Sequence, residues 1–584
     1  MRLSLLPLGL CTLLATASAQ VAPRLIVAYP PDGHTVTADH VIVEGSVSPG
    51  ARLQISGKPA EVAPDGLYTL WWPLSPGVNT LRLVTTAGGQ TASRTVKVTR
   101  RTPLPAQPTA IRPGSLQPSG RMEFWDLAND SPAERQFEVR FEGSPGGRAT
   151  FRLGSGPAQP MREASAGVYV GTLSLPLSSV LDQAAVTFTL TGKSGKSVSA
   201  TAPGRVSTGT GPATATQNPG TVRGLGLDEA AFSVTTLDGT PLLYPREGTR
   251  FVAVGRQGED IRVRLAPGLS ALVTAEQVTL TKGVPLPAMP GAVSLDPAPA
   301  DELRLRLPLG ARVPFSLAQT GSRLDLTLYG LSETPAVPNL SDPLLTGIRA
   351  APLGLEVSRL SLDLAAPQLW GFYAAYEGND LLLTVRRPPA LDPLRPLAGR
   401  VITLDPGHGG SNLGGAGLLG TPEKGLTLPV ALRAAELLRA QGAVVNVTRD
   451  RDVFVGLSER GLQAEQTRAD LLVSLHHNAL PDGRDPRGIR GPEVYYTWSQ
   501  AETLAGAILE QLRAQLPELG VGAGLKPGAN LSLTRPSTQI SLLVEMAYLT
   551  DAGNVRVIHS PAGQERLAQA IAAGITDFYR SQGR

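Results

Sequence analysis

Two histidines and two glutamates in the last third of the chain are candidates for metal-dependent chemistry. They are His408, Glu423, His476 and Glu545; the histidines and Glu545 stand at or just beyond the ends of apolar, strand-like runs, and Glu423 directly precedes a helix-like segment. Two imidazoles and a carboxylate are the ligand set of a catalytic zinc site, which keeps a fourth position for water. The sequence therefore predicts a zinc site built from these side chains.

The elements around these residues are typical of an α/β domain. Beyond Pro389, helix-period segments alternate with runs that are apolar on both faces, a pattern that indicates a mostly parallel sheet covered by helices. Ligands of such sheets bind beyond the carboxyl ends of the strands, where the four residues stand. We expect strands at 401–404, 444–447, 470–475, 493–496 and 541–545, and helices at 426–438, 457–468, 501–516 and from 560.

Seven short motifs follow one another over the segment 400–583. They are ITLDPGHGG (402–410), Glu423-Lys424, VTRD (447–450), LSERG (457–461), ADLLVSLHHN (469–478), PEVYY (492–496) and SLLVEMAYLTD (541–551). In this order they resemble the catalytic domain of zinc-dependent N-acetylmuramoyl-L-alanine amidases of the DPGHGG type, the amidase 3 family. The resemblance implies that His408, Glu423 and His476 bind a zinc ion (Zn2+) and that Glu545 is the catalytic carboxylate. It also implies hydrolysis of the amide bond between N-acetylmuramic acid and L-alanine of peptidoglycan.

The same segment departs from the family in four places. Ser411-Asn412-Leu413 replaces a charged Lys-Asp-Pro, and Pro429 fits the first helix only if that helix begins near Thr427 as its N-cap. His477 replaces a small residue, and alternation along a strand allows only one of the two adjacent histidines to face the site. The segment 479–492 is short and lacks the inhibitory helix that some relatives insert there.

Structural roles are expected for the other polar residues of the motifs. Asp405 suits orienting the neighbouring histidine or capping its loop as well as it suits touching substrate. Arg449 and Arg460 are expected to be ion-pair partners. Glu493 could be a second carboxylate in the site, but an exposed position at a strand edge is expected for it. His559, just before a helix start, is not expected to bind metal.

The composition favours β structure in the rest of the chain. The 584 residues include 64 glycines and 51 prolines, whereas charged residues make up 17% and aromatic residues 5%. Many short strands and turns fit these values better than a helical bundle does, and the length requires several domains. The formal net charge of +4 is weak for this length, so no nucleic-acid partner is expected.

The first residues have the pattern of a secretory signal. An apolar run ends in the small residues 17–19, which predicts a signal peptide at 1–19 with cleavage after Ala19. Cys11, the only cysteine, follows Leu10 where a lipoprotein signal has a small residue, so we expect neither a lipid anchor nor a thiolate metal site. No later run reaches the roughly 20 apolar residues of a membrane span. We expect an exported protein of the periplasm, cell wall or extracellular space without a stable membrane anchor.

Turn signals and Pro-rich stretches divide the chain into several β-rich parts before the α/β domain. The expected order is a signal peptide at 1–19, an immunoglobulin-like β-sandwich at 24–101, a Pro-rich linker at 102–114, a second β domain at 115–202, a linker at 203–220, an SH3-like and further β-rich wall-targeting region at 221–388, and the zinc amidase domain at 395–584.

Two other functions compete with peptidoglycan hydrolysis. The first is a non-catalytic protein that binds peptidoglycan or organises the envelope, since β-rich parts make up most of the chain; retention of all four site residues argues against it. The second is a zinc peptidase of other specificity, which the ligand set does not exclude and which only the resemblance disfavours. Peptidoglycan is the expected partner both of an amidase and of a wall-binding protein. The sequence does not indicate which envelope proteins, if any, are partners.

Overall fold

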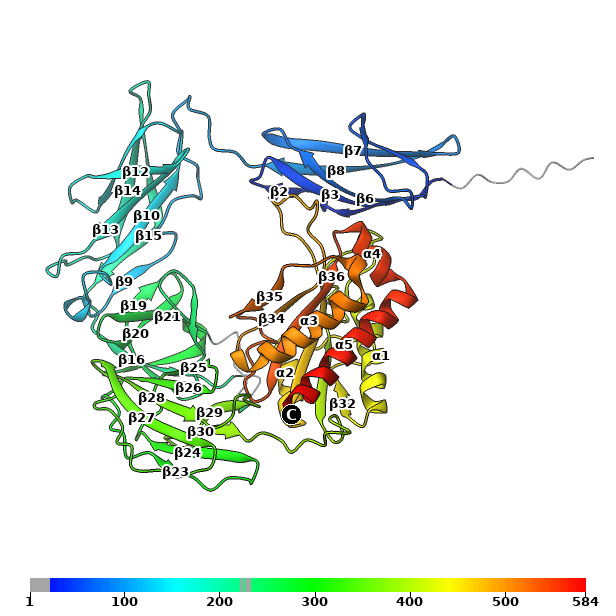
Figure 1. Ribbon diagram of the computed structural model, residues 1–584. Coiled ribbons are helices and arrows are strands. Elements are labelled where there is room, and N and C mark those ends of the chain that lie inside the picture. Colours follow the sequence, from blue (N-terminus) through cyan, green and yellow to red (C-terminus); the bar gives the residue numbers. More distant parts are fainter. Residues whose placement is uncertain (1–21, 221–223, 226–232, 584) are drawn as a thin grey trace, which may run out of the picture. The chain divides into compact units, whose positions relative to one another are not determined.

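The structure, a computed structural model, describes residues 22–220, 224–225 and 233–583 (Figure 1). The expected signal peptide at 1–19 lies outside the described residues. Contacts divide the chain into two compact units. The first consists of the described residues up to Arg101 with Ala416–Gly420 and Pro481–Arg487, and the second consists of Thr102–Gly415, Thr421–Leu480 and the described residues from Gly488 on.

The first unit holds a β-sandwich. Alternating apolar residues, such as Val41 and Val43 on one strand and Leu53 and Ile55 on another, point into a shared core between two sheets. One sheet has the order β1 (Leu25–Tyr29), β3 (His40–Val47), β6 (Leu67–Pro73), and the other the order β2 (His34–Val36), β8 (Gln90–Arg100), β7 (Gly77–Ala87), β4 (Arg52–Ile55), β5 (Lys58–Ala60).

The second unit begins with a long connected ladder of 14 strands. The segment 203–220, expected to be a flexible linker, instead carries the end of β15 and all of β16, so that expectation is wrong. The strands of the ladder are β9 (Met122–Phe124), β10 (Gln136–Glu142), β11 (Arg148–Leu153), β12 (Gln159–Ser165), β13 (Val168–Ser174), β14 (Ala184–Thr191), β15 (Ser197–Thr208), β16 (Ala213–Gln217), β17 (Val234–Thr235), β18 (Pro241–Leu243), β19 (Arg250–Gln257), β20 (Asp260–Ala266), β21 (Leu269–Thr274) and β22 (Val278–Lys282).

Two four-stranded sheets follow and share one core. Leucines at every second position, as in Leu303, Leu305 and Leu307, are buried between the sheets, as a period of two requires. The sheets have the orders β23 (Ser294–Leu295), β24 (Glu302–Pro308), β30 (Asp380–Arg386), β29 (Phe372–Glu377) and β25 (Phe315–Thr320), β26 (Arg323–Tyr329), β28 (Val357–Leu364), β27 (Leu345–Gly354).

The C-terminal part is the expected α/β domain with a six-stranded, mostly parallel sheet (Figure 1). Four strands run parallel to one another, whereas β34 pairs antiparallel with β36 and parallel with β35. The helices α1 and α3 pack on α5, and α2 contacts β31 and β33. The sheet order is β32 (Val444–Val447), β31 (Val401–Pro406), β33 (Leu471–Asn478), β36 (Ile540–Tyr548), β34 (Glu493–Tyr496), β35 (Gly524–Pro527), and the helices are α1 (Lys424–Ala440), α2 (Leu457–Gln466), α3 (Glu502–Gln515), α4 (Ala552–His559) and α5 (Pro561–Gln582).

The start of α1 differs from the expected one. The helix begins at Lys424, and its N-cap Glu423 lies four residues before the predicted cap Thr427. Pro429 therefore lies inside the helix and lacks the N–H that would bond the carbonyl of Gly425. The strand β35 and the helix α4 were not predicted from the sequence. Among the described residues, no helix is both long and apolar enough to cross a membrane.

Candidate active site

Three neighbouring strands bring the predicted residues to one edge of the sheet. β31, β33 and β36 are parallel neighbours, so their carboxyl ends meet there. His476 on β33 is the register partner of Glu545 on β36, and His408 follows β31 by two residues. Glu423 reaches the same place from the N-terminal end of α1.

His408, Glu423 and His476 form a compact cluster of possible metal ligands. One ligand atom from each of the three lies within 4.8 Å of the other two. Oε2 of Glu423 is 3.0 Å from Nε2 of His408, and Oε1 is 3.0 Å from Nδ1 of His476. The two imidazole rings meet edge to face, with centroids 4.8 Å apart. Each carboxylate oxygen therefore faces a different histidine, and the three side chains converge on one point.

Glu423 is buried and held by the backbone as well as by the histidines. The N–H of Gly415 donates to Oε2 at 3.0 Å, and the N–H of His477 donates to Oε1 at 2.9 Å. Burial alone would raise the pKa of Glu423, but the hydrogen bonds and charges of His408 and His476 outweigh burial and lower it. Glu423 is therefore an anion at neutral pH, as a metal ligand must be.

The loop around His408 fixes the orientation of its ring. His408 has φ 62°, a left-handed conformation that non-glycine residues seldom adopt. Its Nδ1 lies 2.9 Å from Oδ1 of Asn412, so Nδ1–H donates to the amide oxygen and Nε2 is left to face Glu423. Asn412 belongs to the stretch in which the sequence departs from the family, and it supplies the partner that orients this ligand.

A glycine is required beside His476. A Cβ on Gly407 would lie 2.3 Å from Cε1 and 2.4 Å from Nε2 of the His476 ring. Gly414 is confined in the same way, because a Cβ there would lie 2.6 Å from both Oε2 of Glu423 and Cδ2 of His408. The glycines of this loop thus let the backbone approach the ligands closely.

Asp405 belongs to a buried hydrogen-bond network next to the site. It is fully buried, its Oδ1 accepts a 2.7 Å hydrogen bond from Nη1 of Arg460, and its Oδ2 accepts one of 2.6 Å from Ser474. Arg460 also donates to the carbonyl of His408 at 2.7 Å. Arg460 is therefore the expected ion-pair partner, and the pair positions the backbone of His408.

Arg449 differs from the expectation. Its guanidinium donates to the backbone carbonyls of Pro406, Gly407 and Lys424, each at 2.9 Å. In the ranges that the structure covers, no carboxylate lies within ion-pair distance of Arg449. The side chain ties the loop before His408 to the start of α1 through carbonyl groups, which a sequence pattern does not reveal.

Glu545 is half-buried and poised to exchange a proton. Its Oε2 has no hydrogen-bond partner among the described residues. Burial, together with the charges of Glu423 and Glu493 and against that of His476, raises the pKa of Glu545 to about 7. A carboxylate with such a pKa suits a general base at neutral pH.

Glu493 is not an exposed strand-edge residue, and that expectation is wrong. The side chain is 4% exposed and accepts hydrogen bonds from the hydroxyl groups of Tyr495 at 2.5 Å and Tyr548 at 2.9 Å. Because β34 runs against β36, the first residue of β34 is the register partner of Glu545. The sequence left a second carboxylate in the site open as an alternative, but the antiparallel pairing of β34 that brings Glu493 there is not visible in the sequence pattern.

The other two histidines of the region stay outside the cluster. His477 is buried, neither of its ring nitrogens has a hydrogen-bond partner among the described residues, and burial lowers its pKa to about 4. Only His476 of the adjacent pair belongs to the cluster, as strand alternation predicted. His559 at the end of α4 is not part of it either.

The cluster opens into a cavity of about 480 Å³. His408 and His476 lie at one side of it, and Phe454 and Leu457, both more than half exposed, line another. Ser532 contributes a hydroxyl group to the lining. A ligand in this cavity would touch the metal cluster and an apolar wall together.

Comparisons with known proteins place this domain in a family. The family described as Amidase_3, N-acetylmuramoyl-L-alanine amidase, matches residues 402–577. N-acetylmuramoyl-L-alanine amidase LytC of Bacillus subtilis is 34% identical over 189 residues, which are 32% of this chain and 36% of LytC. The germination-specific N-acetylmuramoyl-L-alanine amidase of the same organism is 30% identical over 208 residues, with 32% of this chain and 83% of the relative covered.

Among solved structures, N-acetylmuramoyl-L-alanine amidase AmiC2 of Nostoc punctiforme is 33% identical, with a TM-score of 0.29; 31% of this chain and 98% of that chain are covered. The matched range 402–577 contains His408, Glu423, His476 and Glu545. Through its C-terminal domain, the chain belongs to the N-acetylmuramoyl-L-alanine amidase family.

Proposed function

We propose that the chain hydrolyses the amide bond between the lactyl group of N-acetylmuramic acid and L-alanine in peptidoglycan. The observation that carries the proposal is the convergence of His408, Glu423 and His476 beside the unpartnered carboxylate of Glu545. The relatives that share this domain are amidases by description, and the cavity at the cluster has room for a part of the wall polymer.

The three clustered side chains fit a zinc ion. Two imidazole nitrogens and a carboxylate oxygen are the donors of a catalytic zinc site with an open fourth position, and the mature chain has no thiolate to offer. A bound zinc ion supplies Lewis acidity, which polarises the scissile carbonyl and makes water a nucleophile at neutral pH. His408, held by Asn412, and Glu423, held by two backbone N–H groups, are oriented before any metal arrives.

Glu545 is proposed as the proton carrier. Its carboxylate accepts a proton from the attacking water and returns it to the leaving amine, a transfer for which a pKa of about 7 is well matched. Glu493, the register partner of Glu545, helps to keep the pKa of Glu545 high through its charge, in addition to the larger effect of burial. Glu423 and Glu545 therefore have different roles, one as ligand and one as base.

Substitution separates the two roles. His476→Ala removes one of three ligands, so zinc binding and hydrolysis should both be lost. Glu545→Gln keeps the shape but accepts no proton, so zinc should remain while hydrolysis falls about 10²-fold or more. The measurements are metal content of the purified proteins and mass analysis of digested peptidoglycan.

The digestion products also test the substrate assignment. Free glycan strands together with stem peptides that begin with L-alanine support an amidase. Cuts within the peptides would indicate a zinc peptidase instead, and loss of zinc in Glu545→Gln would place Glu545 among the ligands. If sacculi remain intact after incubation with the zinc-loaded protein, the result would favour the non-catalytic, wall-binding alternative.

The proposal extends to the place of action and to the β-rich parts. A substrate in the cell envelope requires export, in line with the signal-like sequence at 1–19. We assign the segment 22–388 to an arm that holds the catalytic domain, residues 395–584, near the wall. With a net charge of only +4, such an arm must recognise the wall through shaped sites rather than through charge.

A further inference from the structure

A second cavity lies in the second unit, apart from the metal cluster. It has a volume of about 270 Å³ and is bounded by four segments that are distant in sequence. Tyr244 comes from the turn after β18, Phe315 from the start of β25, and Trp498, Asn530 and Arg535 come from the α/β domain. The proposed reaction uses none of these residues.

Arg535 is a buried cation without a counter-charge in the part of the chain that the structure describes. The residue is 5% exposed, and among the described residues no carboxylate lies within ion-pair distance of it. Its guanidinium makes only long contacts to neutral atoms, 3.2 Å and 3.3 Å to the carbonyl and side-chain oxygens of Asn530 and 3.3 Å to Oγ of Ser532. Nε has no partner among the described residues. Burying a guanidinium in this way is costly unless an anion compensates it.

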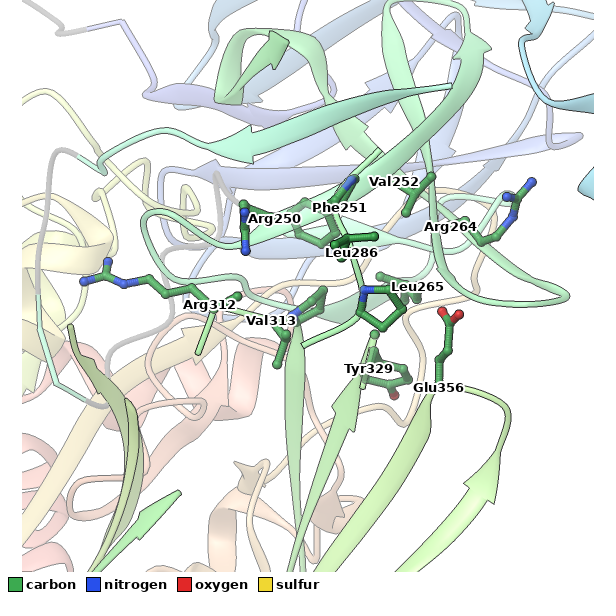
Figure 2. Close-up of a pocket in the computed structure, with 15 residues that line it drawn as sticks. Arg250, Phe251, Val252, Arg264, Leu265, Leu286, Arg312, Val313, Tyr329 and Glu356 are labelled. Carbon is green, nitrogen blue, oxygen red and sulfur yellow. The ribbon is translucent and has the colours of Figure 1, made fainter. Parts of the chain in front are cut away.

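Of the other buried arginines, Arg449 has no carboxylate partner among the described residues but donates to three backbone carbonyls at 2.9 Å, and two more are paired with carboxylates. Arg460 pairs with Asp405 at 2.7 Å, and Arg262 pairs with Asp130 at 2.6 Å. A smaller cavity has a volume of about 50 Å³, and Arg264 is among the residues that line it (Figure 2). Arg264 pairs with Asp126 at 2.7 Å. Among the described residues Arg535 has no such carboxylate partner, and it lines a cavity more than five times larger, so the cavity has both the charge and the room for an anionic ligand.

The walls of the cavity restrict the kind of anion. The guanidinium carbon of Arg535 lies 4.7 Å from the ring centroid of Tyr244, whose hydroxyl donates to Oδ1 of Asn530 at 2.9 Å. Phe315 and Trp498 supply further aromatic surface. Inorganic phosphate would leave these walls unused, whereas a carboxylate on a compact carbon body would use both the cation and the apolar surface.

The position of Arg535 points to the source of that carboxylate. Ser532, which accepts from Arg535, also lines the cavity at the metal cluster. One short segment of chain thus borders both cavities, and a ligand beside Arg535 is held next to the bound wall polymer. Stem peptides are the part of that polymer that carries free carboxylates.

We propose that this second cavity is a binding site for a carboxylate of a peptidoglycan stem peptide, with Arg535 as its ionic partner and the rings of Tyr244 and Trp498 as its walls. The source of the carboxylate rests on the proposed function. The site itself rests on the buried, uncompensated cation and the cavity that it lines.

The test uses the full chain carrying His476→Ala, because this background lacks a complete metal site and does not hydrolyse peptide or retain product there. A stem peptide that begins with L-alanine and D-glutamate is titrated calorimetrically into this protein. Binding should persist, and adding Arg535→Gln should weaken it at least tenfold, while Arg535→Lys should give an intermediate affinity. Arg349→Gln, which changes an exposed arginine of β27, is the matched control and should leave the affinity unchanged.

Thermal unfolding gives a second readout that does not depend on the folding of one variant. The stem peptide should raise the unfolding temperature of the His476→Ala protein but not that of its Arg535→Gln derivative. Equal affinity with and without Arg535, or no binding in the His476→Ala background, would overturn the proposal. Equal or tighter binding of inorganic phosphate, or binding of neutral N-acetylglucosamine that does not need Arg535, would overturn the ligand class. Because these proteins are inactive, failure of the amidase assignment is detected separately by the digestion products of the unmodified chain.

Discussion

One added methyl group at position 407 should disable the metal cluster. In Gly407→Ala the new Cβ would lie 2.3 Å from Cε1, 2.4 Å from Nε2 and 2.7 Å from Nδ1 of His476. Carbon atoms in contact keep about 3.5–4.0 Å, so the imidazole must retreat by roughly an ångström. Nδ1 of His476 would then leave the position from which it faces Glu423, 3.0 Å away.

A displacement of this size has a predictable cost. Misplacing a reacting or binding group by about 1 Å lowers rates by about 10²-fold, and metal sites tolerate only about 0.5 Å. We therefore expect zinc affinity and peptidoglycan hydrolysis of Gly407→Ala to fall together by about 10²-fold, with the fold retained. The assays are competition with a zinc chelator and release of L-alanine-first peptides from sacculi.

The matched control makes the same change where there is space. A Cβ on Gly506, inside α3, meets nothing within 4 Å, so Gly506→Ala should leave zinc affinity unchanged and stabilise the helix by about 1 kcal/mol. Unchanged zinc affinity in Gly407→Ala would refute the reasoning, because it would show that the His476 ring is not held against this backbone. A similar loss of zinc in both variants would show that the assay reports general destabilisation.

Two further substitutions test buried charges elsewhere. Asp405→Asn leaves Arg460 buried without its anion, so the free energy of unfolding should fall by about 3–5 kcal/mol in denaturant titrations at pH 7, and a loss below about 1 kcal/mol would contradict a buried pair. In the first unit, burial raises the pKa of Glu44 to about 8 from an ordinary 4.5, so the folded state prefers the protonated acid and loses stability as pH rises from about 4.5 to 8. Glu44→Gln should therefore stabilise the sandwich by several kcal/mol at pH 8 and by little at pH 4; an equal effect at both pH values would contradict an ionisable, buried Glu44.

The metal cluster could be predicted from the sequence because two general properties of strands determine its position. Strands that are apolar on both faces run parallel, and parallel strands put their carboxyl ends at one edge, so His408, His476 and Glu545 had to meet. Alternation along β33 separated His476 from His477. The family motifs then assigned the carboxylates, a step that the residue pattern alone left open.

Features that depend on contacts between distant segments could not be predicted from the sequence. The strand β35 has four residues without an apolar run, and it exists because it pairs with β34. The supposed linker at 203–220 contains glycines, but a Cβ on Gly204 would lie 2.1 Å from the carbonyl oxygen of Gly120, so that glycine marks close approach of two backbones rather than flexibility. The carbonyl partners of Arg449 and the missing partner of Arg535 likewise become visible only when distant segments are assembled.

The reversed direction of β34 has a consequence for how the site can change over time. In the parallel strands β31, β33 and β36 the chain leaves the sheet at the catalytic edge, whereas in β34 the chain enters the sheet there. The connection from β33 to β34 therefore begins and ends at that edge, between His476 and Glu493, without crossing the sheet. The register between Glu493 and Glu545 holds the β34 end of this connection in place. The connection can therefore change in length at the catalytic edge at little cost to the sheet.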